Sequence, residues 1–516
     1  MQLTQSLRRA AQLFPGRTST VFGKRRRTWA ETADRVARMA GGIAALGVQP
    51  GERVMILASN SDRYLESVYA LFWAGCVVVP GNTRWAASEH AYAWNDCQPS
   101  LLLVDQDFVD LARGLPRFDA SRTVFIGDAP PADLVGFESL VNSCGPLPDR
   151  AGQGHDMAAI MYTGGTTGAA KGVMLSHDNL ALAPVTFALE CTYEEDVVFM
   201  HVAPMFHLAA MSSMLSYTSA GATQVILARF DPAMVVSCIA AEKVNMTLLV
   251  PTMIDFVDRY LQAVPTDVSS LRKLIYGGSP ISEALLRRAM KSLPGVQLFQ
   301  AYGQTEMSGG VVVLRPEFHV VEGSNARLLC SAGRPTLAAE LRIVNEQMQE
   351  VPRGTVGEIV VRGSTVMLGY WNKPDQTRAA IVDGWLRSGD AGYMDEEGFI
   401  FVVDRLKDMI VSGGENVYSA EVENALARHP AVLECAVIGV PHEQWGEAVH
   451  AEIRLREGQE VDEETLVQHC LSLISGYKRP RSFYFRTDPL PLSAAGKVMK
   501  NEIRKPYWKG QNRRIA

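Results

Sequence analysis

The chain has 516 residues, of which 47% are hydrophobic and 21% are charged. At roughly 150 residues per domain, this length predicts about three folding units. The ordinary apolar fraction and a net charge of only −6 exclude general disorder. Fifty basic and fifty-six acidic residues give no electrostatic reason to expect a nucleic acid or an anionic membrane as a partner.

The apolar runs and the cysteines favour a cytoplasmic protein that is not integral to a membrane. The longest clean apolar run, Val68 to Val79, ends at Pro80 and is too short to cross a bilayer. No signal peptide is visible at the N-terminus. The two cysteines closest in sequence, Cys76 and Cys97, are too far apart for a CxxC pair. The cysteines are therefore expected to be buried thiols in a reducing compartment.

The first 150 residues alternate between strand-like and helix-like periods. Apolar residues recur at helical spacing over Trp29 to Leu46 and Arg63 to Trp73. Short strand-like runs cover Arg53–Leu57, Cys76–Val79, Leu101–Val104 and Thr123–Ile126. This alternation is typical of βαβ units in a parallel sheet with both faces covered, and it continues from about 157 to 330.

The sequence pattern changes at about residue 331. Leu341–Val344, Glu358–Arg362 and Gly398–Val403 are short strands between Gly and Pro turns, which predicts a small β-rich subdomain. After Asp404 the chain has the pattern of a compact α+β unit. The predicted fold class is α/β, with a large N-terminal domain over residues 1–403 that includes the β-rich subdomain. A boundary over 404–408 and a small α+β C-terminal domain over 409–516 follow.

Two segments are rich in residues that carry charge or contact phosphate. Lys24 to Arg27 lies where a hairpin turn is expected, and we interpret it as a solvated turn. A loop over residues 161–172 combines glycines, threonines and a final lysine, so its N–H groups, hydroxyls and ammonium can surround phosphate oxygens. It is not a Walker A loop, because Ala170 precedes Lys171 and Gly172 follows it. Taken alone, the loop is either a phosphate site or an ordinary surface loop.

This loop resembles the phosphate-binding signature of the adenylate-forming superfamily, which comprises acyl-CoA synthetases, adenylation domains and luciferases. Further segments resemble that family's motifs in the expected order and span nearly the whole chain. They are Pro204–His207, Tyr276–Pro280, Tyr302–Glu306, Trp385–Asp390, Asp404–Asp408, Ser412–Tyr418 and Pro491–Lys497.

The resemblance implies an AMP-forming carboxylate–CoA ligase that uses ATP, Mg²⁺ and coenzyme A. Negative charge then develops at the α-phosphate and on departing pyrophosphate, and fixed cations and donors must offset it. The resemblance assigns this catalytic task to Lys497, Glu306, Thr166 and Lys171, with Glu306 and Thr166 at the magnesium ion. The implied ATP and AMP contacts are Thr163, Gly164, Gly165, Thr166, Thr167, Gly168, Lys171, Gly278, Ser279, Pro280, Tyr302, Gly303, Gln304, Thr305, Asp390, Arg405 and Lys497.

The resemblance also assigns the hinge, the CoA side and the acid pocket. Lys407 is the implied pivot between the two domains, and the CoA-side residues are Ser412, Gly413, Gly414 and Glu415. The expected acid pocket consists of His207, Met211, Thr252, Gly277, Gly309 and Gly310. Consecutive glycines leave space and the apolar neighbours disfavour a polar amino acid, so a medium-chain fatty or aromatic acid is expected.

Two alternatives to the CoA ligase stay open at this point. One is a stand-alone adenylating enzyme that loads a carrier-protein thiol, and the other is a non-catalytic acyl-nucleotide sensor. Retention of both Lys497 and Glu306 argues against a sensor, since a binder needs no groups for the transition state. The expected partners are small molecules, and a homodimer is left open.

Overall fold

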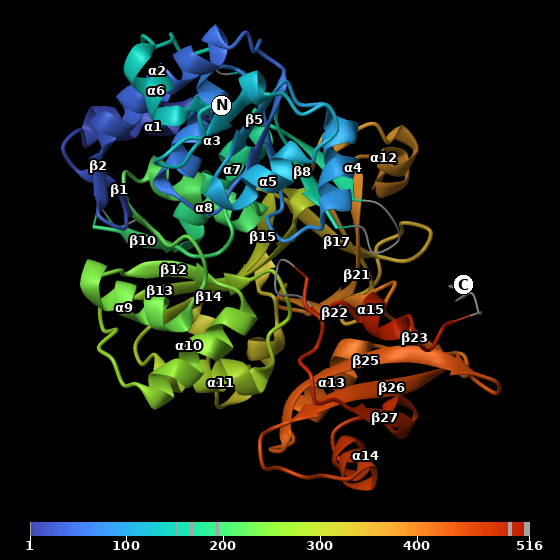
Figure 1. The fold of residues 1–516 in the computed structure, drawn as a ribbon. Coiled ribbons are helices and arrows are strands. Elements are labelled where there is room, and N and C mark those ends of the chain that lie inside the picture. Colours follow the sequence, from blue (N-terminus) through green and yellow to red (C-terminus); the bar gives the residue numbers. More distant parts are fainter. Residues whose placement is uncertain are drawn as a thin grey trace.

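The computed structural model describes residues 2–150, 152–164, 170–191, 194, 196–493 and 498–509. Within these ranges the strands form one nine-stranded, one eight-stranded and two five-stranded sheets. Figure 1 shows a large body that contains the N-terminus and a smaller orange-to-red body at the C-terminal end. The α/β class with a large N-terminal and a small C-terminal domain is confirmed.

The eight-stranded sheet has the order β19-β9-β8-β4-β3-β5-β6-β7. Its strands from β8 to β7 run parallel, whereas β9 pairs antiparallel with both β8 and β19. The strands are β3 Arg53–Leu57, β4 Val77–Pro80, β5 Leu101–Val104, β6 Thr123–Phe125, β7 Val135–Gly136, β8 Met157–Thr163, β9 Lys171–Ser176 and β19 Gly369–Tyr370. The helices of this part are α2 Trp29–Ala45, α3 Asp62–Trp73, α4 Ala87–Cys97, α5 Val109–Arg113 and α6 Phe137–Ser143.

The nine-stranded sheet has the order β16-β15-β14-β13-β12-β10-β11-β1-β2. Its strands are β1 Thr18–Phe22, β2 Arg25–Thr28, β10 Val198–His201, β11 Thr223–Ile226, β12 Met246–Leu249, β13 Lys273–Gly277, β14 Gln297–Gln304, β15 Gly309–Leu314 and β16 Arg334–Pro335. The associated helices are α1 Thr4–Leu13, α7 His177–Cys191, α8 Leu208–Ser219, α9 Pro232–Glu242, α10 Pro251–Ala263 and α11 Glu283–Ser292. One hydrophobic cluster contains residues of both large sheets and of α8. Its members include Ile56 and Val78 of the eight-stranded sheet, Val311 of the nine-stranded sheet and Met211 and Leu215 of α8.

The β-rich part and the C-terminal domain supply the two smaller sheets. The first contains β17 Glu340–Val344, β18 Gly357–Arg362, β20 Ile381–Val382, β21 Trp385–Met394 and β22 Ile400–Arg405, with α12 Pro374–Ala380 nearby. The second contains β23 Ile410–Ser412, β24 Glu415–Val417, β25 Val432–His442, β26 Gly446–Leu455 and β27 Ser482–Phe485, with α13 Ser419–Ala427, α14 Glu463–Leu471 and α15 Lys500–Arg504. Short 3₁₀ helices cover η1 Gln106–Phe108, η2 Ala120–Arg122, η3 Thr305–Met307, η4 Pro316–Phe318, η5 Ser324–Cys330 and η6 Gly476–Lys478.

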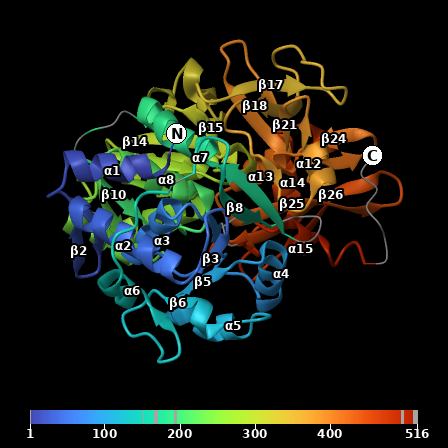
Figure 2. The same ribbon diagram turned by 90° about the horizontal axis from the view of Figure 1, so that it is seen from above.

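The C-terminal sheet has its own hydrophobic cluster, which includes Ile410, Val422 and Val449. Seen from above in Figure 2, its elements β24, β25 and β26 lie on the side of the molecule away from α1 and β2. A separate core is what allows a small domain to move as a unit.

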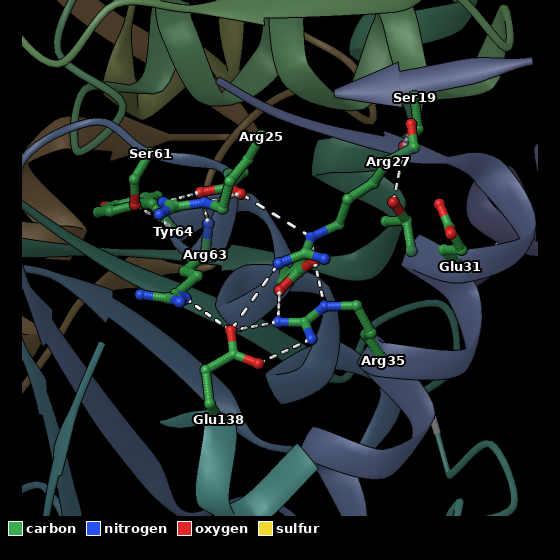
Figure 3. Close-up of polar contacts among 12 residues, drawn as sticks. Ser19, Arg25, Arg27, Glu31, Arg35, Ser61, Arg63, Tyr64 and Glu138 are labelled. Atoms are coloured by element: carbon green, nitrogen blue, oxygen red, sulfur yellow. Dashed lines mark hydrogen bonds and ion pairs between the residues drawn. The ribbon is translucent and has the colours of Figure 1, made fainter. Parts of the chain in front are cut away.

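The basic run at the first hairpin is not the solvated turn that the sequence suggested. Side chains alternate across a strand, so in β2 Arg25 and Arg27 point inward while Arg26 points outward to Glu242, 2.8 Å away. Arg25 Nη2 lies 2.8 Å from an Asp62 oxygen, and Arg27 Nε lies 3.0 Å from Glu66 Oε1. The hairpin is present, but two of its arginines are part of a charged cluster inside the domain (Figure 3).

Arg35 links the acidic members of this cluster. It donates to both oxygens of Glu66 and to both oxygens of Glu138, at 2.8–2.9 Å, and Glu66 is fully buried. Burial alone would raise the pKa of Glu138, but the hydrogen bonds from Arg35 and the charge of Arg63 outweigh it and lower the pKa to about 2. The cluster therefore ties β2, α2, α3 and α6 together through compensated charges (Figure 3).

Two further expectations concern membranes and thiols. Among the described residues, no helix combines the length and apolarity needed to span a bilayer. All eight cysteines are free thiols, and Cys76, Cys97, Cys191 and Cys470 are buried as expected. Cys330 is exposed, because it ends η5 at the surface, so the expectation of burial was wrong there.

Candidate active site

Asp390 on β21 is the centre of the first polar network. The Tyr302 hydroxyl and the Gln304 amide both donate to Oδ2 at 2.7 Å, and Arg405 Nε lies 2.7 Å from Oδ1. Burial and then the charge of Asp390 raise the pKa of Tyr302 well above its usual range. An ionised carboxylate accepts about four hydrogen bonds, so these three donors leave room for one more from a ligand.

Strand pairing explains why these residues meet. Asp390 and Arg405 are direct partners in the antiparallel β21–β22 pair, and Tyr302 and Gln304 are at the carboxyl end of β14. The resemblance predicted all four residues as ATP and AMP contacts. The structure brings all four together.

Glu358 on β18 is a residue that the sequence analysis missed. It is buried, and its two oxygens accept hydrogen bonds from the Gly389 N–H at 3.0 Å and from Arg387 Nε at 2.8 Å. Gly389 has a φ of +69°, which an L side chain rarely adopts. Glu358 thereby holds the backbone just before Asp390, and a glutamate within the apolar run of β18 was the available signal.

The second network contains Glu306, Tyr370 and Lys171. The Tyr370 hydroxyl donates to Glu306 Oε1 at 3.0 Å, and the Lys171 ammonium lies 4.8 Å from the centre of the Tyr370 ring. Lys171 also pairs with Thr163 across β8 and β9, so the two ends of the predicted phosphate loop lie side by side.

The sequence analysis did not predict Tyr370, because β19 has only two residues and no sequence pattern identifies the strand with which it pairs. A methyl group on Gly164 would meet no other atom within 4 Å, so that side of the residue faces open space. Five predicted residues lie outside the described ranges: Gly165, Thr166, Thr167, Gly168 and Lys497.

Glycines bring the ends of three neighbouring strands close together. A methyl group on Gly277 would lie 2.1 Å from the Ala301 carbonyl oxygen, and one on Gly303 would lie 1.7 Å from the Gly309 oxygen. No side chain fits at either position, so β13, β14 and β15 converge here. Gly278, Ser279 and Pro280 follow β13 directly, and Thr305 begins η3 directly after Gln304.

The predicted acid-pocket residues fall into two groups. His207 is the N-cap of α8, its carbonyl accepts from the Met211 N–H at 3.0 Å, and the helix faces Gly309 at the start of β15. Gly309 and Gly310 are half-buried and pair with Gln304 and Gly303. Thr252 lies in the first turn of α10, on the Gly278 side, where Val250 is 3.8 Å from the Cβ position of Gly278.

The connection between the domains is partly buried. Burial lowers the pKa of Lys407, against the opposing charge of Asp408. The Asp404 carboxylate accepts from the Ser419 hydroxyl at 2.6 Å, and Lys500 donates to the same hydroxyl at 2.6 Å. Arg428 lies 2.7 Å from Glu283 of the N-terminal domain.

The predicted CoA-side residues lie on a hairpin of the C-terminal domain. Ser412, Gly413, Gly414 and Glu415 form the β23–β24 hairpin, whose tip is exposed. Among the described residues, the backbone hydrogen bonds of this hairpin stay within the C-terminal domain, as between the Gly413 N–H and the Trp445 carbonyl at 3.0 Å.

Glu306 suits a magnesium ion that is held mainly by phosphate oxygens. Within the described residues, no group of three or more His, Cys, Asp or Glu side chains could hold a metal. Mg²⁺ at nucleotide sites commonly binds one or two carboxylates plus substrate phosphates. Glu306 is half-buried and accepts one hydrogen bond at Oε1, so its other oxygen can face such an ion.

Comparison with known proteins agrees with this geometry. The model of the AMP-binding enzyme family matches residues 7–371, and that of the AMP-binding enzyme C-terminal domain matches residues 421–497. The chain is 38% identical over 505 residues to a feruloyl-CoA synthase of Amycolatopsis sp, covering 97% of this chain and 98% of that protein. It is 35% identical over 507 residues to an indoleacetate–CoA ligase of Aromatoleum aromaticum, covering 98% of each.

A solved structure is similar over the same extent. The o-succinylbenzoate CoA synthetase of Bacillus subtilis, in complex with its acyl-adenylate intermediate, has a TM-score of 0.85 and 32% identity and covers 96% of this chain and 97% of that one. In complex with ATP and a magnesium ion, the same enzyme has a TM-score of 0.84 and 31% identity, with coverage of 96% and 98%. The chain belongs to the AMP-binding enzyme family. Within it, the chain is an AMP-forming acyl-CoA synthetase, an acid–thiol ligase.

Proposed function

We propose that this enzyme joins an aromatic carboxylic acid to coenzyme A through an acyl-adenylate. Its cosubstrates are ATP and CoA, and it uses Mg²⁺. The observation that carries the proposal is the pair of networks around Asp390 and Glu306, whose groups lie midway along β21 and just after β14 and are suited to ribose and phosphate. The aromatic preference is supported by the feruloyl and indoleacetate relatives.

The described residues would have the following roles in binding and catalysis. Asp390 binds the ribose while Arg405 and Tyr302 hold its carboxylate in place. Lys171 and Glu306 sit at the phosphate end, where Lys171 offsets negative charge and Glu306 takes a magnesium ion. We further propose that the domain over 409–516 turns about Lys407 between the two half-reactions.

A panel of acids tests the substrate class. Ferulate, 4-hydroxycinnamate, cinnamate, indoleacetate, octanoate and palmitate are compared by CoA-dependent AMP formation at equal concentration. The proposal expects the highest kcat/KM with an aromatic acid, and octanoate or palmitate as the best substrate would overturn it. Acyl transfer to a carrier protein in place of CoA, with no acyl-CoA formed, would favour the carrier-loading alternative.

Replacing Glu306 by Gln should raise the Mg²⁺ concentration for half-maximal rate by roughly tenfold, because the neutral amide is a poorer ligand for a hard cation. The KM for the acid should change little. The rate is titrated against Mg²⁺ at saturating ATP, and Glu317→Gln, at an exposed acid on the neighbouring η4 turn, is the control. A Glu306→Gln curve that overlays the parent curve would show that Glu306 does not bind the ion.

Replacing Lys407 by Pro should separate the two half-reactions, because proline fixes φ near −65° and restricts rotation at the pivot. Adenylate formation, measured by pyrophosphate exchange, should be retained, whereas acyl-CoA formation should fall by roughly tenfold or more. Lys407→Ala keeps the backbone free and is the control. Normal acyl-CoA formation by Lys407→Pro would place the pivot elsewhere.

A further inference from the structure

Ser212 differs from the other serines of α8 in the hydrogen bonding of its hydroxyl. The hydroxyls of Ser213, Ser216 and Ser219 donate to the carbonyl four residues earlier, at 2.9, 2.7 and 2.9 Å. This back-bonding is the ordinary way for a helical serine to satisfy its hydroxyl. Ser212 is 2% exposed, and among the described residues its Oγ has no hydrogen-bond partner.

The Ser212 hydroxyl faces the first residue of β15. A methyl group on Gly309 would lie 3.3 Å from Ser212 Oγ, the first atom it would meet. Gly309 has a φ of +119° and carries no side chain, so none comes between its backbone and the serine. The preceding residue, Ser308, has turned its own hydroxyl away to the Thr365 carbonyl, at 2.6 Å.

This hydroxyl lies among the residues expected to bind the acid. Met211 is its neighbour in sequence, His207 is the N-cap of the same helix, and Gly309 lies opposite the hydroxyl. A buried hydroxyl without a partner lowers the stability of the free protein, and a ligand that supplies a partner recovers that loss on binding. An alkyl chain cannot supply one, whereas a ring substituent with an oxygen can.

We infer that Ser212 is a specificity-determining residue that hydrogen-bonds an oxygen-bearing substituent on the ring of the aromatic acid. The inference rests on the proposed function, because it takes Gly309 and the start of α8 as part of the acid pocket. It narrows the substrate class to aromatic acids with a hydroxyl or a similar polar group. Acids that lack such a group leave the Ser212 hydroxyl unpaired and are selected against.

The test compares acids that differ by one hydroxyl. The kcat/KM for CoA-dependent AMP formation is measured with cinnamate and with 2-, 3- and 4-hydroxycinnamate, using the full-length parent, Ser212→Ala and Ser213→Ala. The parent should prefer at least one hydroxylated isomer to cinnamate by about tenfold. Ser212→Ala should reduce that preference to about twofold or less, while Ser213→Ala should retain it.

Stability supplies a second measurement. Because Ser212→Ala removes a hydroxyl that has no partner, its melting temperature without substrate should equal or exceed that of the parent. Turnover of cinnamates with an unchanged hydroxyl preference in Ser212→Ala would overturn this inference and leave the proposed function standing. Turnover of no aromatic acid by the parent would overturn the proposed function, and this inference with it.

Discussion

Replacing Lys497 by Ala should cut adenylate formation by about 10²–10³, or ~3–4 kcal/mol of transition-state stabilisation. Lys497 is outside the described residues, so the expectation rests on its motif and on the chemistry. A cation is needed only while negative charge develops at the α-phosphate and on pyrophosphate. The loss should therefore appear in pyrophosphate exchange with the acid, and thioester formation from supplied acyl-adenylate should stay within a few-fold of the parent.

Measuring adenylate formation and thioester formation separately tests whether Lys497 acts only in the adenylation step. Lys509→Ala removes another lysine from the same end of the chain, at an exposed position, and should leave both half-reactions unchanged. Equal losses in adenylation and thioester formation would indicate general damage to the domain. The assignment of Lys497 to the adenylation step would then be wrong.

Replacing Glu66 by Gln should destabilise the N-terminal domain by about 3–5 kcal/mol, because it leaves the largely buried Arg35 and Arg27 without one of their charge partners. Glu66 is fully buried and receives two hydrogen bonds from Arg35, and Arg27 Nε lies 3.0 Å from Glu66 Oε1. Glutamine keeps the shape and removes the charge, so little of the effect should come from a cavity. Urea unfolding followed by tryptophan fluorescence gives the shift in midpoint.

The outer face of the same hairpin provides the matched control. Glu242 lies 2.8 Å from Arg26, whose side chain is 56% exposed, and an exposed pair of this kind contributes about 0–1 kcal/mol. Glu242→Gln should therefore barely move the unfolding midpoint. A Glu66→Gln shift no larger than that of Glu242→Gln would contradict the structural role assigned to the buried cluster.

Some residues of the site can be identified from the sequence alone, and others cannot. Asp390, Arg405 and the Tyr302–Gln304 segment lie in short continuous motifs. Their resemblance to the motifs of the family therefore identifies them from the sequence. Tyr370 lies in a two-residue strand with no signature of its own, and the only signal for Glu358 is a glutamate within the apolar run of β18. Each becomes part of the site only because a distant strand pairs beside it: β19 with β9, and β18 with β21.

The sequence by itself determined the elements and the family. Runs such as Arg53–Leu57 and Leu101–Val104 coincide with β3 and β5 because period and apolarity are local properties. It did not determine that β1 pairs with β11, about two hundred residues later, nor that Arg25 and Arg27 point inward. Those outcomes depend on which distant surfaces bury each other, since an arginine on a strand faces solvent or a buried carboxylate according to what packs against that face. Only the tertiary structure decided this, and with it the contacts that join Lys171, Tyr370 and Glu306.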